Sequence, residues 1–192
     1  MKLPKSFYLQ EDVVSIARQL IGKVLYTNID GIITAGIISE TEAYEGTTDK
    51  ASHAFGNRRT KRTETMFAEG GIAYVYLCYG MYELFNVVTN IKDIPHAVLI
   101  RGIIPYEGLE AMAQRRGVEK IKQKDVNGPG KLSKALSISR DLNEFDLNSD
   151  VIWIEDKGVQ IDYNQIVTDK RIGINYAEED ALLPYRFFLN EK

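Results

Sequence analysis

The stretch IITAGIISETEAY, residues 32–44, decides the fold of this chain. It is rich in β-branched residues and alternates in character, which predicts a β-strand. Asp30 and Gly31 directly before it predict a tight turn that joins it to an earlier strand over residues 23–29. The sequence therefore predicts an antiparallel hairpin, with residues 39–44 at its far end.

Polar side chains gather at this far end of the predicted hairpin. With a period of two, Ile38, Glu40, Glu42 and Tyr44 share one face of the strand. Two carboxylates and an aromatic ring therefore leave the strand end on one side, where catalytic groups often lie. A solvated strand face beside a hydrogen-bonded tyrosine gives the same pattern, so the rest of the chain must decide between the two.

The segments around the hairpin predict further strands and a few helices. Helices are predicted over residues 7–20, over 106–117 and directly after the Gly128-Pro129-Gly130 turn. Strands are predicted over residues 72–77, 84–89, 97–104, 151–155, 160–163, 168–174 and 186–189. We expect one α+β domain over residues 1–192, with a largely antiparallel, partly barrel-like β-sheet and a few packed helices.

Composition is that of an ordinary globular protein. The 192 residues are 44% hydrophobic and 27% charged, which fits one domain with a sizeable core. The sequence has no apolar run of membrane-spanning length and no signal peptide, so we expect an intracellular protein without a membrane partner. Cys78 is the only cysteine, which excludes an internal disulfide and indicates a reducing compartment, the cytoplasm in a bacterium. One cysteine and two histidines exclude a Cys/His zinc cluster.

Charge is distributed unevenly along the chain. The net charge is −3, but residues 1–140 carry 19 Lys and Arg against 15 Asp and Glu, and residues 141–192 carry 5 against 12. Within the long loop predicted over residues 45–71, four cations fall in six residues: Arg58, Arg59, Lys61 and Arg62. A long loop in a small domain is usually functional or disordered, and a local basic face can bind phosphates despite an acidic total. A solvated loop remains the alternative.

Arg101 interrupts the apolar strand predicted over residues 97–104. A cation in a buried strand is costly unless it is paired. Arg101 therefore indicates a carboxylate or a phosphate nearby.

An ordered set of short motifs extends over nearly the whole chain and resembles a known family. The matching residues are Glu42-Ala43-Tyr44, His53, Met66-Phe67, Tyr74-Val75-Tyr76, Tyr79-Gly80-Met81-Tyr82, Asn86, Leu99-Ile100-Arg101, Gly128-Pro129, Lys131-Leu132 and Arg171-Ile172-Gly173-Ile174. Each motif is weak alone, but in this order they resemble the mammalian-type alkyladenine (3-methyladenine) DNA glycosylases, which also occur in bacteria. The resemblance implies hydrolysis of the N-glycosidic bond of damaged purines in duplex DNA, without metal or organic cofactor.

The resemblance also implies how the damaged base is held. Tyr79 matches the wedge residue that fills the gap when a nucleotide is flipped out of the duplex. Tyr44 matches one face of an aromatic sandwich around the flipped base, and His53 with Tyr76 the other. Period-two alternation places Tyr76 and Tyr79 on opposite faces, so the strand must end or bend between them, which Gly80 permits.

The catalytic roles follow from the same resemblance. Glu42 matches the general base that activates a water molecule, and Arg101 the arginine that orients it, which leaves Glu40 as structural or solvated. Asn86 matches a pocket residue that disfavours the exocyclic amine of guanine, and the backbone at Ile172 matches a contact to the flipped nucleotide.

The expected enzyme is a monofunctional glycosylase, because no lysine occupies a recognised nucleophile position. Its expected substrates are alkylated or deaminated purines, such as 3-methyladenine, hypoxanthine and ethenoadenine. We expect a monomer without an obligate protein partner that binds DNA phosphates through Arg58, Arg59, Lys61, Arg62 and Lys131. Two alternatives stay open: a non-catalytic domain that binds damaged DNA, and a hydrolase of free nucleosides or RNA.

Overall fold

The strand β2 (Ile32–Tyr44) organises the fold, and the computed structural model describes residues 1–190. The first half of β2 pairs with β1 (Val24–Ile29), which confirms the predicted hairpin, and nearly its whole length pairs with β5 (His96–Glu107). Its second half also pairs with β8 (Arg186–Leu189), at Glu40 to Glu42. The polar end of β2 is therefore held between two strands.

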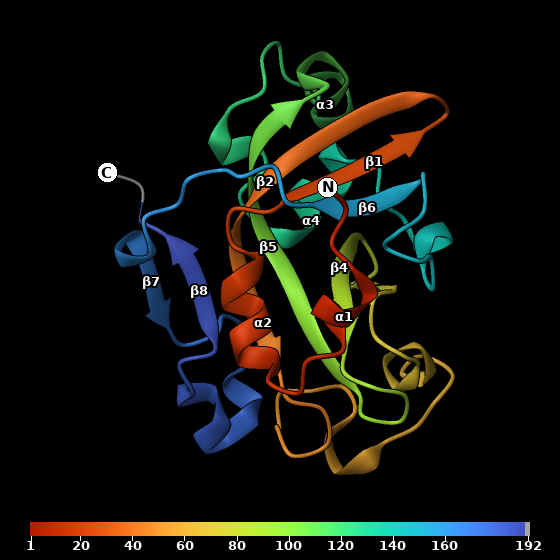
Figure 1. Ribbon diagram of the computed structural model, residues 1–192, viewed down its shortest axis with the longest axis vertical. Helices are drawn as coiled ribbons and strands as arrows, with labels where there is room; N and C mark the ends of the chain where they lie inside the picture. Colours follow the sequence, from red (N-terminus) through yellow and green to blue (C-terminus); the bar gives the residue numbers. More distant parts are fainter. Residues whose placement is uncertain (191–192) are drawn as a thin grey trace.

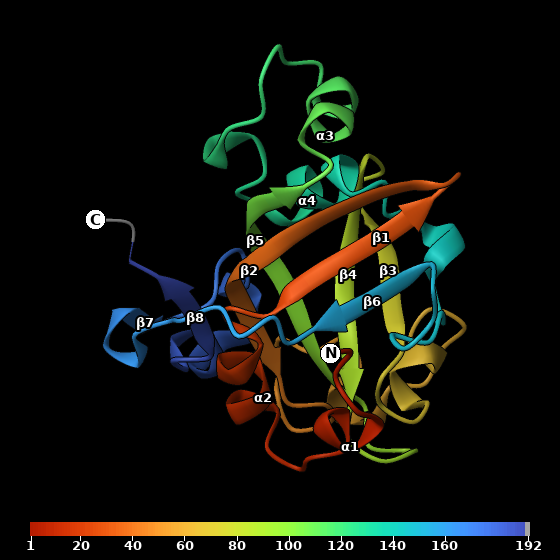
Figure 2. The same cartoon turned by 45° about the horizontal axis from the view of Figure 1, so that its top comes forward.

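The sheet is antiparallel and strongly curved. Its order is β3 (Ala73–Cys78), β4 (Tyr82–Thr89), β5, β2, β1 and β6 (Ile152–Glu155), and β7 (Ile166–Asp169) pairs with β8 beside this path. In Figure 2 the strands β1, β2 and β6 run diagonally across β3 and β4. The predicted α+β fold is confirmed, but the sheet is not closed, so the description as partly barrel-like holds only loosely.

The helices are shorter than the sequence predicts. They are α1 (Lys5–Tyr8), α2 (Val13–Leu20), α3 (Leu109–Arg116) and α4 (Pro129–Ala135). The predicted helix over residues 7–20 is split, because the side chain of Asp12 accepts from the N–H groups of Val14 and Ser15 and caps α2. Among the described residues, no helix is long and apolar enough to cross a membrane.

Several predicted elements have different bounds or are wrong. The helix predicted over residues 106–117 begins only at Leu109, because β5 continues to Glu107 and Gly108 turns the chain at a φ of 72°. The predicted strand over 160–163 is wrong, since the described chain there is irregular up to a short 3-10 turn, Tyr163–Gln165. The strand predicted over 168–174 overlaps β7 only at its first two residues, because β7 begins at Ile166 and ends at Asp169.

A pair of bulges interrupts the pairing of β2 with β5. Ile38 pairs with Ile103, Glu40 with Gly102, and Thr41 with Ile100, so Ser39 and Arg101 are each one extra residue on their strand. The bulges switch the alternation of both strands. Ile38 and Ala43 therefore both belong to the main core. The predicted shared face of Ile38, Glu40, Glu42 and Tyr44 is wrong for Ile38.

The core lies between the sheet and the helices α2, α3 and α4. The hydroxyl of Thr41 on β2 donates to the backbone oxygen of Ala17 in α2 at 2.8 Å, which fixes the core-facing side of the polar strand end. Figure 1 shows α2 in front of the sheet beside β8. Glu40, Glu42 and Tyr44 alternate with Thr41 and Ala43, so they lie on the other face of β2.

Candidate active site

Glu42 is a fully buried carboxylate with a hydrogen-bond donor on each oxygen. Its exposed fraction is 0%. The hydroxyl of Tyr44 donates to Oε2 at 2.7 Å, and the backbone N–H of Ile172 donates to Oε1 at 2.8 Å. Burial raises the pKa of Glu42, and the charge of Arg101 and the two hydrogen bonds only partly offset this rise.

The guanidinium of Arg101 lies between two carboxylates. Its Nε is 3.1 Å from Oε1 of Glu40 and 3.4 Å from Oε1 of Glu42. Glu40 is buried and also accepts from Nε of Arg186 on β8 at 2.6 Å. The prediction that Arg101 lies near a carboxylate is confirmed. Glu40 is not solvated, because its side chain joins Arg101 and Arg186 in one ion-paired cluster.

Tyr44 packs against a second charged pair, Arg171 with Asp49, which the sequence did not predict. The guanidinium of Arg171 lies 4.8 Å from the centroid of the Tyr44 ring and forms a buried ion pair with Asp49. Arg171 also donates to the backbone oxygen of Ala43 at 2.8 Å. The residue after Arg171 is Ile172, so the ion pair places the N–H that contacts Glu42. A lone Asp49 in a polar loop carried no signal that could have revealed this partner.

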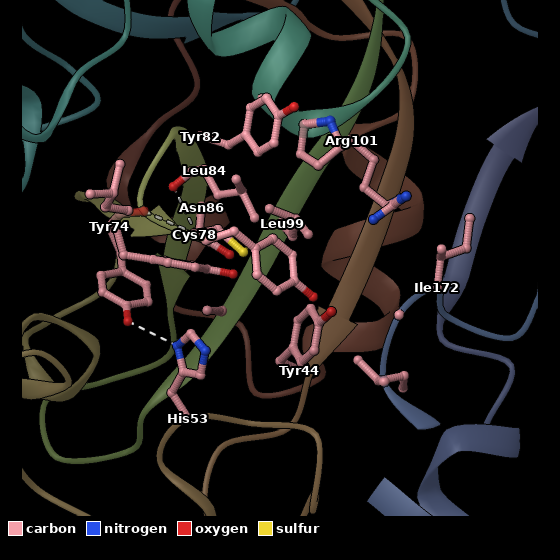
Figure 3. Close-up of a pocket in the computed structure, with 18 of the residues that line it drawn as sticks. Tyr44, His53, Tyr74, Cys78, Tyr82, Leu84, Asn86, Leu99, Arg101 and Ile172 are labelled. Carbon is pink, nitrogen blue, oxygen red and sulfur yellow. Dashed lines mark hydrogen bonds between the residues drawn. The ribbon is translucent and has the colours of Figure 1, made fainter. Parts of the chain in front are cut away.

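A cavity of about 760 Å³ opens in front of these groups. The predicted residues that line it are Tyr44, His53, Arg62, Tyr76, Tyr79, Asn86, Arg101, Lys131 and Ile172. Figure 3 shows His53 and Tyr74 on one side of the cavity and Arg101 and Ile172 on the other. Its volume lies in the range of small-molecule sites. Tyr176, in the loop after β7, is a further lining residue that the sequence did not indicate.

His53 and Tyr76 form one aromatic wall of this cavity. The two rings lie edge to face with centroids 4.7 Å apart. The Nδ1 atom of His53 lies 3.0 Å from the hydroxyl of Tyr74. Burial, with the charges of Arg62 and Arg58, lowers the pKa of His53 to about 4. The imidazole is therefore neutral at pH 7 and offers a flat, uncharged face.

Tyr79 lies at the tip of the hairpin between β3 and β4 and is 86% exposed. Its φ is 50° and that of Gly80 is 70°, so the chain turns here through a conformation that tyrosine rarely adopts. Tyr76 lies within β3, which ends at Cys78. The strand therefore ends between Tyr76 and Tyr79, which satisfies the condition for both rings to border one cavity.

Asn86 and Ile172 border the cavity in different ways. The side-chain nitrogen of Asn86 donates to the backbone oxygens of Tyr74 and Leu84, which leaves its Oδ1 as the acceptor for a ligand. Ile172 lines the cavity, and its backbone N–H is already used by Glu42.

The predicted phosphate-binding cations differ in their surroundings. Arg59 is paired with Glu64 and Asp93, so its charge is largely compensated. Arg62 and Lys131 line the large cavity, whereas Arg58 lines a second cavity of about 340 Å³ next to it. Lys61 is exposed and lines neither of these cavities. Among the described residues, no group of three His, Cys, Asp or Glu side chains could hold a metal ion.

Comparison with known proteins identifies the family. Residues 6–192 match the family described as Methylpurine-DNA glycosylase (MPG). The chain belongs to the methylpurine-DNA glycosylase family. A protein of Chlamydia abortus named "Putative 3-methyladenine DNA glycosylase" is 50% identical over 99% of both chains. Proteins of the same name from Clostridium perfringens strain SM101 and Bacillus thuringiensis are each 44% identical, over 100% and 98% of this chain and 97% and 95% of theirs.

Membership of the methylpurine-DNA glycosylase family confirms the resemblance drawn from the motifs. The chain is a DNA glycosylase of the 3-methyladenine type, a hydrolase of N-glycosyl bonds in DNA repair, and its substrate is DNA. The family match does not itself assign the roles of individual side chains.

Proposed function

We propose that this glycosylase flips an alkylated or deaminated purine out of duplex DNA and hydrolyses its N-glycosidic bond with a water activated by Glu42. The observation that carries the proposal is the fully buried Glu42 together with its contacts. Glu42 does not itself line the aromatic cavity, but its partners Tyr44, Arg101 and Ile172 all do. A carboxylate has about four lone-pair sites, and the donors on Glu42 use one on each oxygen. A lone pair is therefore left to accept a proton from water.

The raised pKa of Glu42 makes it a stronger base than a free glutamate. Arg101 keeps the ionised form accessible, because its positive charge lies 3.4 Å from Oε1. Water bound between these two side chains would attack C1′ of the flipped nucleotide as the purine leaves.

The aromatic cavity supports the choice of substrate. A purine between Tyr44 on one side and His53 with Tyr76 on the other gains about 1–3 kcal/mol of stacking, which offsets part of the flipping cost. Purine nucleotides alkylated at N3 or N7, such as 3-methyladenine, are cationic and gain a cation–π term that normal purines lack. Asn86, which lines the cavity, is the residue proposed to disfavour the exocyclic amine of guanine.

Tyr79 is the proposed wedge, since it is the most exposed of the aromatic rings that line the cavity. The phosphate contacts are proposed for Arg58, Arg62, Lys61 and Lys131, and to a smaller extent for the ion-paired Arg59. A monomer that needs neither cofactor nor protein partner stays a prediction.

The test is base release from duplex DNA that carries a single 3-methyladenine, hypoxanthine or ethenoadenine. Wild type should release the base, and Glu42→Gln should be slower by about 10²–10⁴-fold. Glu40→Gln is the matched control, because it changes a neighbouring buried carboxylate that also pairs with Arg101. Its loss should be at least tenfold smaller.

Four outcomes would contradict the proposal. If Glu42→Gln releases base as fast as wild type, Glu42 is not the base. Binding of damaged duplex without release would favour a binding domain, and release only from free nucleosides or RNA would favour the other alternative. Strand cleavage by the purified protein, without heat or alkali, would refute the monofunctional mechanism.

A further inference from the structure

Arg62 occupies the aromatic wall that the flipped purine needs. Its guanidinium carbon lies 4.7 Å from the centroid of the Tyr76 ring, and its NH2 group is 3.4 Å from Nε2 of His53. Arg62 also lines the cavity together with these two rings. A purine stacked on the same part of the wall would make the contact that the guanidinium now makes, so the two compete for one place.

A second cavity lies directly beside the first and offers Arg62 another position. Its volume is about 340 Å³, and it shares His53, Arg62 and Tyr176 with the larger cavity. Its lining holds the cations Arg58, Arg62 and Lys50, of which Lys50 is ion-paired with Glu178 and Glu179, and the hydroxyl residues Ser52, Thr60 and Thr63. Two arginines with nearby hydroxyls suit a phosphate group, which a guanidinium binds through paired, charge-assisted hydrogen bonds.

The backbone that carries Arg62 is fixed, so the move requires only rotation of the side chain. The backbone N–H of Glu64 donates to the backbone oxygen of Thr60 at 2.9 Å. The hydroxyl of Thr63 donates to the backbone oxygen of Arg58 at 2.9 Å. The Arg62 side chain itself is exposed, and its partners His53 and Tyr76 are uncharged at neutral pH. A phosphate is a stronger partner for the guanidinium than either ring.

We propose that Arg62 fills the base site of the free protein and leaves it when a DNA phosphate binds in the second cavity, which opens the stacking wall for the flipped purine. Arg62 then acts as a specificity-determining residue, because it favours purines attached to DNA over free purines. The proposal rests on the proposed function. By linkage, phosphate binding and base binding must strengthen each other by the same factor.

The test measures binding of free ethenoadenine base to the protein without DNA, through the fluorescence of the base. Arg62→Gln should bind it about tenfold more tightly than wild type, in line with the loss of a competing cation–π contact. Lys157→Gln is the matched control, since Lys157 also lies over a tyrosine ring, 5.5 Å from the centroid of Tyr26, but lines neither cavity. Its affinity for the base should equal that of wild type.

A second arm replaces chloride by inorganic phosphate at equal ionic strength. Phosphate should tighten base binding to wild type about threefold and leave Arg62→Gln unchanged. The proposal would be overturned if Arg62→Gln binds the base no more tightly than wild type, or if neither protein binds it. It would also be overturned if phosphate does not change base binding to wild type. Arg62→Lys provides a second variant if Arg62→Gln does not fold. Its affinity for the base should lie between those of wild type and Arg62→Gln. These outcomes are separate from base release, whose absence in wild type would refute only the proposed function.

Discussion

The buried ion pair between Asp49 and Arg171 leads to a quantitative prediction for Asp49→Asn. The two side chains are 1% and 0% exposed. Arg171 donates to both carboxylate oxygens of Asp49 and to the backbone oxygens of Ala43 and Asp180. The substitution keeps the shape of Asp49 but removes its charge, so it leaves Arg171 as a buried cation without a counter-ion.

The expected cost is about 3 kcal/mol of the free energy of unfolding. Removal of one partner from a buried pair costs about 3–5 kcal/mol, because the other charge is left uncompensated. The lower end applies, since Arg171 keeps two backbone acceptors. A total stability of about 5–15 kcal/mol is usual for a domain, so this loss is large.

The assay is urea unfolding of wild type, Asp49→Asn and the double variant Asp49→Asn/Arg171→Met. The double variant should be more stable than Asp49→Asn, because it removes the stranded charge. Lys50→Gln is the control: it breaks the exposed ion pairs to Glu178 and Glu179 in the same region and should have a much smaller effect. A loss below about 1 kcal/mol for Asp49→Asn, or a double variant that is less stable still, would refute the reasoning.

Three further predictions concern the wedge, the pocket histidine and the basic loop. Tyr79→Ser should lower kcat/KM for damaged duplex by about 10–100-fold and lower it less for a damaged single strand, because it removes about 1–3 kcal/mol of stacking; base release from both substrates measures this. The pKa of His53 is lowered from 6.5 to about 4, so the unfolded chain takes up a proton at higher pH than the folded one. The unfolding free energy should therefore fall by up to about 3 kcal/mol between pH 6.5 and 4, and by correspondingly less in His53→Phe, as urea unfolding across this range would show. Arg58→Ala should reduce the slope of log affinity for duplex DNA against log salt by about 0.9, and the ion-paired Arg59→Ala by less, which titrations at several salt concentrations would measure.

The hairpin and most strands could be predicted from the sequence because they depend on local signals, whereas the cavity residues came from the ordered family motifs. Asp30-Gly31 fixes the turn, and the β-branched run fixes β2. The interruption of an apolar strand by Arg101 was enough to predict a nearby carboxylate. The ordered motifs then brought together side chains that lie far apart in the chain.

What the sequence did not reveal depends on long-range pairing. The bulges at Ser39 and Arg101 arise where β2 meets β5, and no local pattern marks them, so period-two alternation placed Ile38 on the wrong face. Asp49 and Arg171 are 122 residues apart in sequence, so no local pattern reveals their contact. Element ends were shifted for a different, local reason: the Asp12 cap and the turn at Gly108 set helix starts that hydrophobic periodicity alone places earlier.

The burial of Glu42 predicts that the charge of the bound base will set the pH dependence of kcat. In the free protein, burial raises the pKa of Glu42, and Arg101 only partly offsets it. A neutral base such as hypoxanthine closes the cavity and removes more water, so it should raise the pKa of Glu42 further. A cationic base such as 3-methyladenine also removes water, but its positive charge favours the carboxylate. The acid limb of kcat, below which Glu42 is protonated and inactive, should therefore lie at higher pH for hypoxanthine than for 3-methyladenine. Single-turnover base release from the two duplexes between pH 4 and 8 would measure both limbs, and coincident limbs would show that Glu42 does not sense the charge of the base it releases.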